Sequence, residues 1–437
     1  MDYVLYLALA FGFYMAWSIG SNDAANAMGT SVGSKAITFK EAIIIAAVFE
    51  FGGAILAGAN VTDTMRKGII DPAVFNSIPH GAEIFALGML AALIAAAIWI
   101  HIAAFLGWPV STTHSIVGAI TGFGVVAVGL ANVDLGLLAS IVMSWAVSPV
   151  VGGLIAFLVF TGIRKMILDT EEPVVAVKKW APLFAFPVFM VLSLVTFFKG
   201  LKNASWAQDF GPATTFSVAT VVGIFASVAL GLLLRNIDLE SGKAAVRDDG
   251  GKEEEDGGRE KYSQVERVFR YLQTITACFV AFAHGSNDVA NSIGPLAAVV
   301  NLFDGFSFRA GAEITGEVPV PIWVLFLGGL GIVVGLATYG WKIIETIGSK
   351  ITDLTPSRGF AAEFGAATTI LVGSKAGLPL STTHTVVGSV IGVGFARGMN
   401  ALNLKIIWDI IKSWIYTIPF TAILTVILFQ GFKLIFI

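Results

Sequence analysis

The chain has 437 residues, of which 56% are hydrophobic and only 13% are charged, and its net charge is −3. Its mean hydropathy is +0.82. Soluble domains carry about 25% charged residues, so this composition excludes an ordinary soluble protein and indicates a membrane protein. The sequence has no basic stripe, which argues against a nucleic-acid partner. Its single Cys278 excludes an intramolecular disulfide.

Apolar spans of membrane-crossing length fill most of the chain. A hydrocarbon core about 30 Å thick needs about 20 apolar residues per helix, whereas transmembrane strands are shorter and alternate in polarity. We therefore predict an all-α integral membrane protein with about twelve transmembrane or re-entrant helical segments. The predicted spans are 3–20, 42–61, 83–106, 110–131, 136–162, 181–198, 213–234, 269–297, 321–341, 361–378, 383–396 and 406–432.

Two hydrophilic segments interrupt the apolar pattern. Residues 164–180 are basic, and residues 235–267 are rich in glycine and charge, which predicts a flexible linker. The positive-inside rule places both segments in the cytoplasm of a multi-pass protein of the plasma (inner) membrane, with both termini extracytoplasmic. The predicted organisation is a first repeat (1–163), a basic loop with two helices (164–234), the linker (235–267) and a second repeat (268–437).

Three pairs of similar segments occur in the same order in the two halves. GSNDAAN (20–26) recurs as GSNDVAN (285–291), and GWPVSTTHSIVGAITGFG (107–124) recurs as GLPLSTTHTVVGSVIGVG (377–394). A weaker pair joins residues 58–71 to residues 340–353. Seven predicted spans separate equivalent positions of the two repeats. Because this number is odd, the second repeat crosses the membrane in the opposite direction to the first. The sequence therefore predicts two inverted-topology repeats, which place a transporter's binding site near the midplane at the repeat interface.

Each GSND element carries an aspartate inside an apolar run. Because an aspartate in a membrane span costs about 2.5–3.5 kcal/mol, Asp23 and Asp288 are functional candidates. Asn26 and Asn291 follow three residues later on the same helix face. A carboxylate with an amide carbonyl suits a hard cation, and unwinding at the preceding glycine could free backbone carbonyls as further ligands. Helix capping by Ser or Asn is the alternative interpretation.

Each PxSTTH element (109–114 and 379–384) is typical of a helix start, since proline ends one helix and begins the next. Free backbone N–H groups and hydroxyls at a helix N-terminus form an anion site. Under the inverted repeat, two such ends would converge on one tetrahedral oxyanion. Ordinary hydrogen bonding across helices is the alternative. The hydroxyl residues are Ser111, Thr112, Thr113, Ser381, Thr382 and Thr383.

An anion site beside hard-cation ligands predicts cation-coupled anion uptake by alternating access. Phosphate suits this site better than sulfate, because at neutral pH phosphate retains a proton that it can donate to Asp23 or Asp288. Asn22 and Asn287 complete the predicted phosphate site. A channel would need a continuous polar pore or a carbonyl filter, and the sequence has two discrete clusters instead. A hydrolase is disfavoured because a duplicated, inverted set of residues does not suit a one-sided nucleophile.

Four further polar residues lie in apolar runs, namely His114, His384, Glu50 and Glu363. For the histidines, a mobile proton and a structural hydrogen bond are equally open. The glutamates are candidate ion or proton ligands. The two glutamates are not equivalent in the repeat, since the weak match puts Ile332 opposite Glu50 and the offset of the second motif puts Leu93 opposite Glu363.

The paired GSNDxAN and PxSTTH elements resemble the inorganic phosphate transporter (PiT) family, and the likeness covers essentially the whole chain apart from residues 235–267. The resemblance implies an integral membrane phosphate symporter with duplicated halves. It also implies a transport site formed by the GSND elements and by residues 111–113 and 381–383, and it associates Glu50 and Glu363 with transport. The short central loop, compared with that of animal members, suggests a bacterial or archaeal protein.

Members of the family use sodium or protons, and some carry metal–phosphate complexes. We expect sodium as the co-transported ion, held by Asp23, Asn26, Asp288 and Asn291, because several neutral oxygen ligands surround each aspartate. Proton coupling and transport of a related oxyanion such as sulfate remain open, as does a homodimer. The expected partners are inorganic phosphate, sodium or protons, and the lipid bilayer. We expect neither an organic cofactor nor an enzymatic activity.

Overall fold

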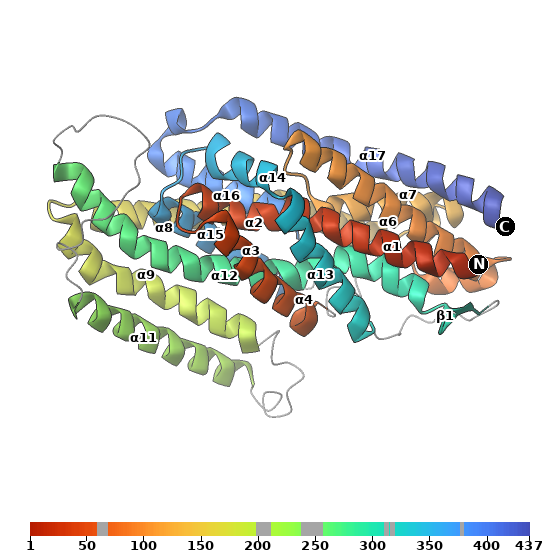
Figure 1. Ribbon diagram of the computed structural model, residues 1–437, viewed down its shortest axis with the longest axis horizontal. Helices are drawn as coiled ribbons and strands as arrows, with labels where there is room; N and C mark the ends of the chain where they lie inside the picture. Colours follow the sequence, from red (N-terminus) through yellow and green to blue (C-terminus); the bar gives the residue numbers. More distant parts are fainter. Residues whose placement is uncertain (59–68, 198–210, 237–256, 310–313, 315–319, 376–379) are drawn as a thin grey trace.

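The computed structural model describes residues 1–58, 69–197, 211–236, 257–309, 314, 320–375 and 380–437, and these are almost entirely helical (Figure 1). The elements of the first half are α1 (Asp2–Ile19), η1 (Gly20–Ala24), α2 (Ala25–Gly33), α3 (Phe39–Ile45), η2 (Ala46–Glu50), α4 (Phe51–Ala57), η4 (Pro72–Ser77), α6 (Gly81–Leu106), α7 (Thr112–Ala127), η5 (Leu130–Asn132), α8 (Leu135–Ile163) and η6 (Arg164–Leu168). Two helices, α9 (Pro173–Val195) and α11 (Pro212–Asn236), then form a hairpin.

The second half begins with α12 (Gly257–Val300) and a small antiparallel hairpin, β1 (Phe303–Asp304) with β2 (Ser307–Phe308), in which Phe303 pairs with Phe308. The remaining elements are α13 (Ile322–Tyr339), α14 (Trp341–Glu345), η8 (Thr346–Lys350), α15 (Pro356–Lys375), α16 (Thr382–Arg397), η9 (Met399–Ala401) and α17 (Leu404–Phe436).

The helices confirm the predicted all-α membrane fold. Each predicted apolar span contains helix, and among the described residues seven helical stretches are long and apolar enough to cross a membrane. They are Asp2–Gly33, Gly81–Leu106, Leu135–Leu168, Pro173–Leu194, Pro212–Arg235, Ile322–Tyr339 and Leu404–Phe436. Helix α7, with 16 residues, is shorter than a full crossing. The total of twelve segments remains a prediction.

Several predicted boundaries are wrong. The first span does not stop at residue 20, because the chain stays helical through the GSND element to Gly33. The hydrophilic segment 164–180 is mostly helix, with only residues 169–172 between η6 and α9. The predicted linker is shorter too: α11 extends to Asn236 and α12 begins at Gly257. The rest of that linker, and most of the weak repeat segment 58–71, lie outside the described residues.

Helices α1 and α12 lie side by side and run in opposite directions (Figure 1). Gly12 of α1 packs against Leu296, whereas Asp23, in η1 directly after α1, lies beside His284. The first GSND element continues α1 and the second lies in α12, so the equivalent parts of the two halves are inverted. Both chain termini lie at the same end of the molecule (Figure 1).

The two halves also approach each other at two equivalent glycines. A Cβ added to Gly20 would lie 1.9 Å from the carbonyl oxygen of Ile332, and a Cβ added to Gly285 would lie 2.1 Å from that of Glu50. Only glycine permits such backbone contact. The packing confirms that Ile332 and Glu50 occupy equivalent places, as the sequence repeat predicted.

The C-terminal helices of the repeats are exchanged between the halves. Helix α8 of the first half packs on α16 of the second, and α17 of the second half packs on α7 of the first. Helix α6 joins the second pair through Trp99, whose Nε1 donates to Thr417 Oγ1 at 2.9 Å. The halves are therefore interlocked around their shared centre.

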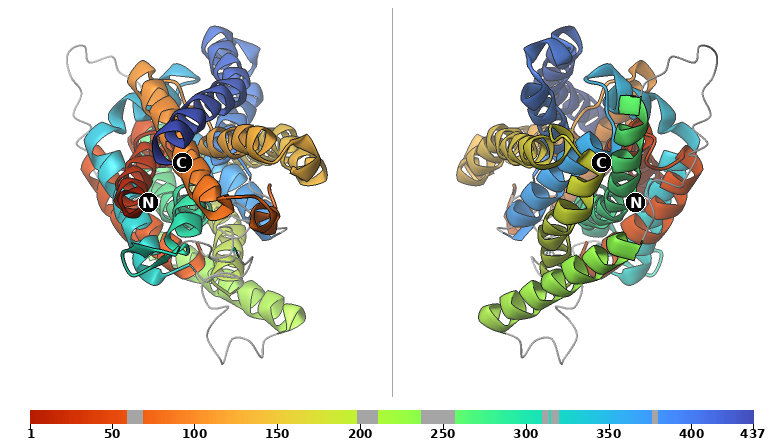
Figure 2. Two further views of the ribbon diagram at one scale, coloured as in Figure 1. Left: turned by 90° about the vertical axis from the view of Figure 1, so that its right-hand side faces the viewer. Right: turned by 90° about the vertical axis from the view of Figure 1, so that its left-hand side faces the viewer.

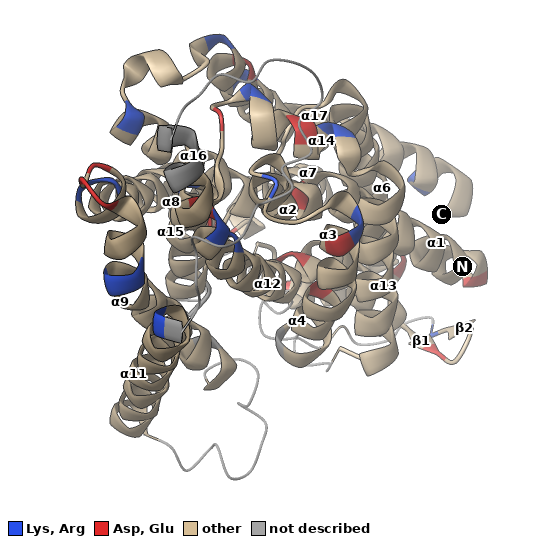
Figure 3. Ribbon diagram, turned by 60° about the vertical axis from the view of Figure 1, so that its left-hand side comes forward, with Lys and Arg blue, Asp and Glu red and all other residues tan. Residues whose placement is uncertain are grey.

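The α9–α11 hairpin lies at the side of this bundle (Figure 2). Helix α11 packs mainly on α9, and α9 packs on α12. Basic residues gather at the end of the molecule where α8 stops and α9 begins (Figure 3). There Arg164 Nη1 donates to the carbonyl of Ala396 at 2.7 Å and ties the end of α8 to that of α16.

Candidate functional site

Both GSND elements lie inside helices and are buried. The first crosses η1, a π-helical turn, and the second lies within the continuous 44-residue helix α12. The capping interpretation is therefore wrong, and so is the expectation of unwound backbone at the preceding glycines. The buried polar residues of these elements are Ser21, Asn22, Asp23, Asn26, Ser286, Asn287, Asp288 and Asn291.

The two STT elements begin helices α7 and α16, as predicted. Ser111 and Ser381 are the N-cap residues, and each hydroxyl accepts a hydrogen bond from the backbone N–H three residues later, at 3.2 Å. A serine at this position satisfies one of the free N–H groups of the first turn. Pro379, which precedes the second element, lies outside the described residues.

The two helix starts converge. Thr113 Oγ1 donates to the carbonyl of Leu380 at 3.4 Å, and Thr383 Oγ1 donates to the carbonyl of Val110 at 3.1 Å. Each helix start is thus bonded to the residue that precedes the STT element of the other repeat. Two helix N-termini, with their partial positive charges, face one buried centre.

The aspartates accept hydrogen bonds from the threonines of their own repeat. Thr112 Oγ1 donates to Asp23 Oδ2 at 2.5 Å, and Thr382 Oγ1 donates to Asp288 Oδ2 at 2.6 Å. All four residues are buried. This matched pair of bonds joins each GSND element to its own STT helix start.

A second set of bonds crosses between the repeats. Asn26 Nδ2 donates to Thr383 Oγ1 at 3.0 Å, and Asn291 Nδ2 donates to Thr113 Oγ1 at 3.2 Å. Thr383 Oγ1 also lies 2.5 Å from Asp23 Oδ1. The structure therefore brings together the candidate aspartates, asparagines and threonines from both halves.

Asn22 and Asn287 hold the chain that leads into the helix starts. Asn22 Nδ2 donates to the carbonyl of Trp108 at 2.9 Å, and its Oδ1 accepts from the N–H of Val110 at 3.2 Å. Asn287 Nδ2 donates to the carbonyl of Leu380 at 3.3 Å. These contacts position the helix starts rather than leaving the amides free to face a ligand.

His284 is the site residue that the sequence reasoning missed. Its Nε2 lies 2.8 Å from Asp288 Oδ2, and its Nδ1 lies 3.3 Å from Glu50 Oε1. All three side chains are buried. The signal was present, since His284 directly precedes the second GSND element, where the first copy has Ile19.

Glu363 forms a separate buried cluster with residues of α2 and α12. Its carboxylate accepts from Thr30 Oγ1 at 2.8 Å, Gln273 Nε2 at 3.0 Å and Thr276 Oγ1 at 2.6 Å, and also from the hydroxyl of Ser31. The sequence indicated Glu363 but none of these four partners.

His114 and His384 meet at the centre of the molecule in a stack of rings. The ring centroids lie 3.6 Å apart for Trp145 and His114, 4.2 Å for His114 and His384, and 3.6 Å for His384 and Trp414. His384 Nδ1 is 3.3 Å from the carbonyl of Trp145. This contact supports the structural interpretation of His384, and a mobile proton on these residues stays a prediction.

The site residues fit an alkali cation. Oxygen atoms suit hard cations, and carboxylate, amide and hydroxyl oxygens surround Asp23. Asn26 Oδ1 is buried and accepts no hydrogen bond from the part of the chain that is described. One oxygen from each of Asp23 and Asp288 and one nitrogen of His284 lie within 4.8 Å of one another. A cation there would offset the repulsion between two buried carboxylates.

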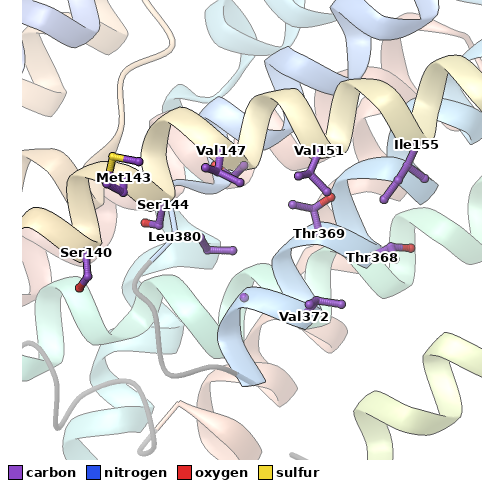
Figure 4. Close-up of a pocket in the computed structure, with 12 residues that line it drawn as sticks. Ser140, Met143, Ser144, Val147, Val151, Ile155, Thr368, Thr369, Val372 and Leu380 are labelled. Atoms are coloured by element: carbon purple, nitrogen blue, oxygen red, sulfur yellow. The ribbon is translucent and has the colours of Figure 1, made fainter. Parts of the chain in front are cut away.

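A cavity of about 420 Å³ lies between α8 and α15, next to the second helix start (Figure 4). Ser144, Val147, Thr369 and Val372 point into it, and Leu380 also lines it. None of its lining residues is charged. It is therefore unsuited to phosphate, and the polar centre described above is the candidate site.

Inverted helical repeats with a buried polar centre between them define a multi-pass membrane protein of the secondary-transporter type. Comparison with known proteins agrees with this class. The chain belongs to the phosphate transporter family, which it matches over residues 19–425.

Similar proteins come from all domains of life. A Haemophilus influenzae protein named "Putative phosphate permease" is 44% identical over 435 residues, covering 100% of this chain and 98% of that protein. Inorganic phosphate transporter 2-1, chloroplastic, of Arabidopsis thaliana is 44% identical and is covered over 71% of its length. A solved structure described as the sodium-dependent phosphate transporter is 38% identical, with a TM-score of 0.82 and 99% of both chains covered.

Proposed function

We propose that this protein is a sodium-coupled symporter of inorganic phosphate that works by alternating access. One observation supports coupled binding of the cation and phosphate. The hydroxyls that would bind phosphate donate to the aspartates that would bind the cation. Thr112 donates to Asp23, and Thr382 donates to Asp288. The solved relative described as sodium-dependent supports sodium as the ion.

The order of binding follows from these hydrogen bonds. Phosphate entering beside Asp23 and Asp288 would meet two negative charges, and a like-charged pair 4 Å apart costs about 4 kcal/mol at an effective dielectric constant of 20. Sodium bound by Asp23 with Asn26, and by Asp288 with Asn291, would offset this repulsion. The threonine hydroxyls would then be free to donate to phosphate. Sodium therefore binds first and phosphate second.

The bound phosphate would lie between the two helix starts. Each start presents backbone N–H groups, hydroxyls and the positive end of a helix dipole to an anion. Ser111, Thr112 and Thr113 would contact it from one side, and Ser381, Thr382 and Thr383 from the other. A proton retained by phosphate could be donated to an aspartate, whereas sulfate would leave that acceptor unmatched. Asn22 and Asn287 act by positioning the helix starts.

The inverted repeats supply the two alternating states. Rocking of one repeat against the other around a fixed central site exposes that site first to one side and then to the other. Bonds between the repeats, such as those of Asn26 and Asn291, must rearrange during this movement. Glu363, which joins α15 to α2 and α12, is a further candidate ion or proton ligand.

The arrangement of basic residues supports an orientation in the plasma (inner) membrane. The end at which α8 stops and α9 and α12 begin would face the cytoplasm, according to the positive-inside rule. Both termini, at the opposite end (Figure 1), would then be extracytoplasmic.

Proton coupling is the second candidate. The contact of His284 with both Asp288 and Glu50 favours it, because a histidine between two carboxylates can carry a proton. The discriminating experiment is uptake of ³²P-labelled phosphate into proteoliposomes with an inward sodium gradient or an inward proton gradient, with and without excess sulfate. Sodium-driven uptake insensitive to sulfate is expected. Uptake driven only by the proton gradient would make the proton, not sodium, the coupled ion. No uptake under either gradient would overturn the proposed phosphate transport.

A further inference from the structure

The two cation half-sites differ although the repeat places them in equivalent positions. In the first half-site, Ile19 precedes Gly20 and Ile332 packs against that glycine. In the second, His284 precedes Gly285 and Glu50 packs against it. Two apolar residues beside Asp23 thus correspond to an imidazole and a carboxylate beside Asp288.

The ring of His284 holds one oxygen of Asp288. Nε2 lies 2.8 Å from Oδ2, and the other ring nitrogen is 3.3 Å from Glu50, so the ring is fixed from both sides in a buried place. A ring that carries a proton on the nitrogen facing Asp288 competes with a cation for that carboxylate and offers the cation no lone pair. Asp288 Oδ1 accepts in addition from Asn287 Nδ2 at 2.7 Å. Asp288 Oδ2 is therefore shared between the hydroxyl of Thr382, at 2.6 Å, and the His284 ring, and Oδ1 is engaged by an amide N–H, which cannot turn into a ligand.

Asp23 accepts from the hydroxyls of two threonines, whereas Asp288 accepts from that of one. The shortest contacts of Asp23 are the hydroxyls of Thr112 and Thr383, at 2.5 Å each. A hydroxyl can rotate its proton away and present a lone pair, so the same side chain serves an empty site and an occupied one. Asn26 Oδ1, buried and without a hydrogen bond among the described residues, is already available as a ligand.

We propose that the two half-sites bind sodium unequally: Asp23 with Asn26 takes the first ion tightly, and Asp288 takes the second ion weakly because His284 and Glu50 hold it. His284 is thus a positioning residue that sets the order in which the cations bind. The inference rests on the proposed sodium coupling and adds to it a first and a second site.

Binding of ²²Na⁺ to the purified full-length protein, measured without phosphate, tests this order. Wild type should show a tight and a weak component. Asp23→Asn should weaken the tight component by about tenfold or more, the range for losing a group that shapes a metal site. Asp288→Asn should leave the tight component in place and remove the weak one. Equal losses in the two variants would overturn the proposal.

A second variant tests His284 directly. The double substitution Glu50→Ile with His284→Ile gives the second half-site the residues of the first, and should tighten the weak component by about tenfold. His101→Gln changes a histidine that bonds Tyr14 outside the site, at 2.6 Å, and should leave both components unchanged. An unchanged weak component in a double variant that elutes as a single species in size-exclusion chromatography would contradict the role of His284.

These outcomes separate the inference from the function on which it rests. Wild-type protein that binds no sodium and takes up phosphate without it would overturn the sodium coupling. Wild-type protein that needs sodium but has two equal sites would overturn only the inequality.

Discussion

Asn26 and Thr383 are separated by 357 residues in the chain, yet their side chains are hydrogen-bonded at 3.0 Å. The bond joins the first GSND element to the second STT helix start. Its counterpart joins Asn291 to Thr113 at 3.2 Å. Each half of the protein therefore completes the polar site of the other, and neither half alone would form the site.

Removing the threonine hydroxyls should weaken phosphate binding. Thr112→Val or Thr382→Val keeps the shape of the side chain but removes a donor to the anion. A hydrogen bond to a charged group contributes about 1.5–3 kcal/mol, so the phosphate concentration for half-maximal uptake should rise by about tenfold or more. The control is Thr385→Val, since Thr385 Oγ1 donates only within its helix, to the carbonyl of Ser381 at 2.8 Å. A rise no larger than that of the control would contradict the assignment of the anion site.

The close approach of the halves at Gly20 should not tolerate a methyl group. Gly20→Ala would place Cβ 1.9 Å from the carbonyl oxygen of Ile332 and force the helices apart. Overpacking of this kind costs about 1–3 kcal/mol, and we expect a lower melting temperature in detergent. Gly52→Ala, in helix α4, is the matched control, because the added Cβ has no described residue of a neighbouring element within 4 Å, and it should leave the melting temperature unchanged or raise it. Equal melting temperatures for the two variants would argue against the described contact.

Glu363 should stabilise the fold as well as serve transport. Glu363→Ala would leave the buried donors of Gln273 and Thr30 without their acceptor. A buried donor without an acceptor costs about 1–3 kcal/mol, so the melting temperature in detergent should fall. Glu345→Ala removes a surface carboxylate, paired with Lys350 at 3.3 Å, and should have little effect. Equal melting temperatures for the two variants would contradict the hydrogen-bonded cluster around Glu363.

The orientation can be tested by cysteine labelling in a Cys278→Ser background. Asp304→Cys, in the small hairpin at the end that holds the termini, should react with a membrane-impermeant maleimide added to intact cells. Glu171→Cys, in the turn between η6 and α9, should react only after permeabilisation. Both positions are exposed. The reverse pattern would invert the proposed topology.

The repeated motifs revealed much of the site from the sequence alone, because polar residues at fixed spacing in apolar helices have few explanations other than function. Even the placing of Ile332 opposite Glu50 is confirmed by their equivalent glycine contacts. His284 was not found because it breaks the repeat, and comparing the copies drew attention only to what they share. The partners of Glu363 were missed for a different reason: they come from α2 and α12, and contacts between distant helices leave no pattern in the chain.

Helix boundaries were the less predictable part of the fold. A buried aspartate and asparagine after an apolar run resemble a helix end, yet the tertiary bonds of Asp23 and Asn26 satisfy these groups and the helix continues to Gly33. Charged residues after Gly257 resemble a linker, yet they begin α12. One of them, Glu266, accepts from the backbone N–H of Ser357 at 2.7 Å and from its hydroxyl at 2.7 Å, and so fixes the start of α15.

Sodium bound at the aspartates should free the threonine hydroxyls to bind phosphate. The most direct measurement is binding of ³²P-labelled phosphate to the purified protein at rising sodium concentration, together with ²²Na⁺ binding at rising phosphate concentration. Coupling between two ligands is reciprocal, so sodium should tighten phosphate binding and phosphate should tighten sodium binding by the same factor. Potassium in place of sodium serves as the control for ionic strength. Phosphate binding that is equally tight with and without sodium would contradict the account.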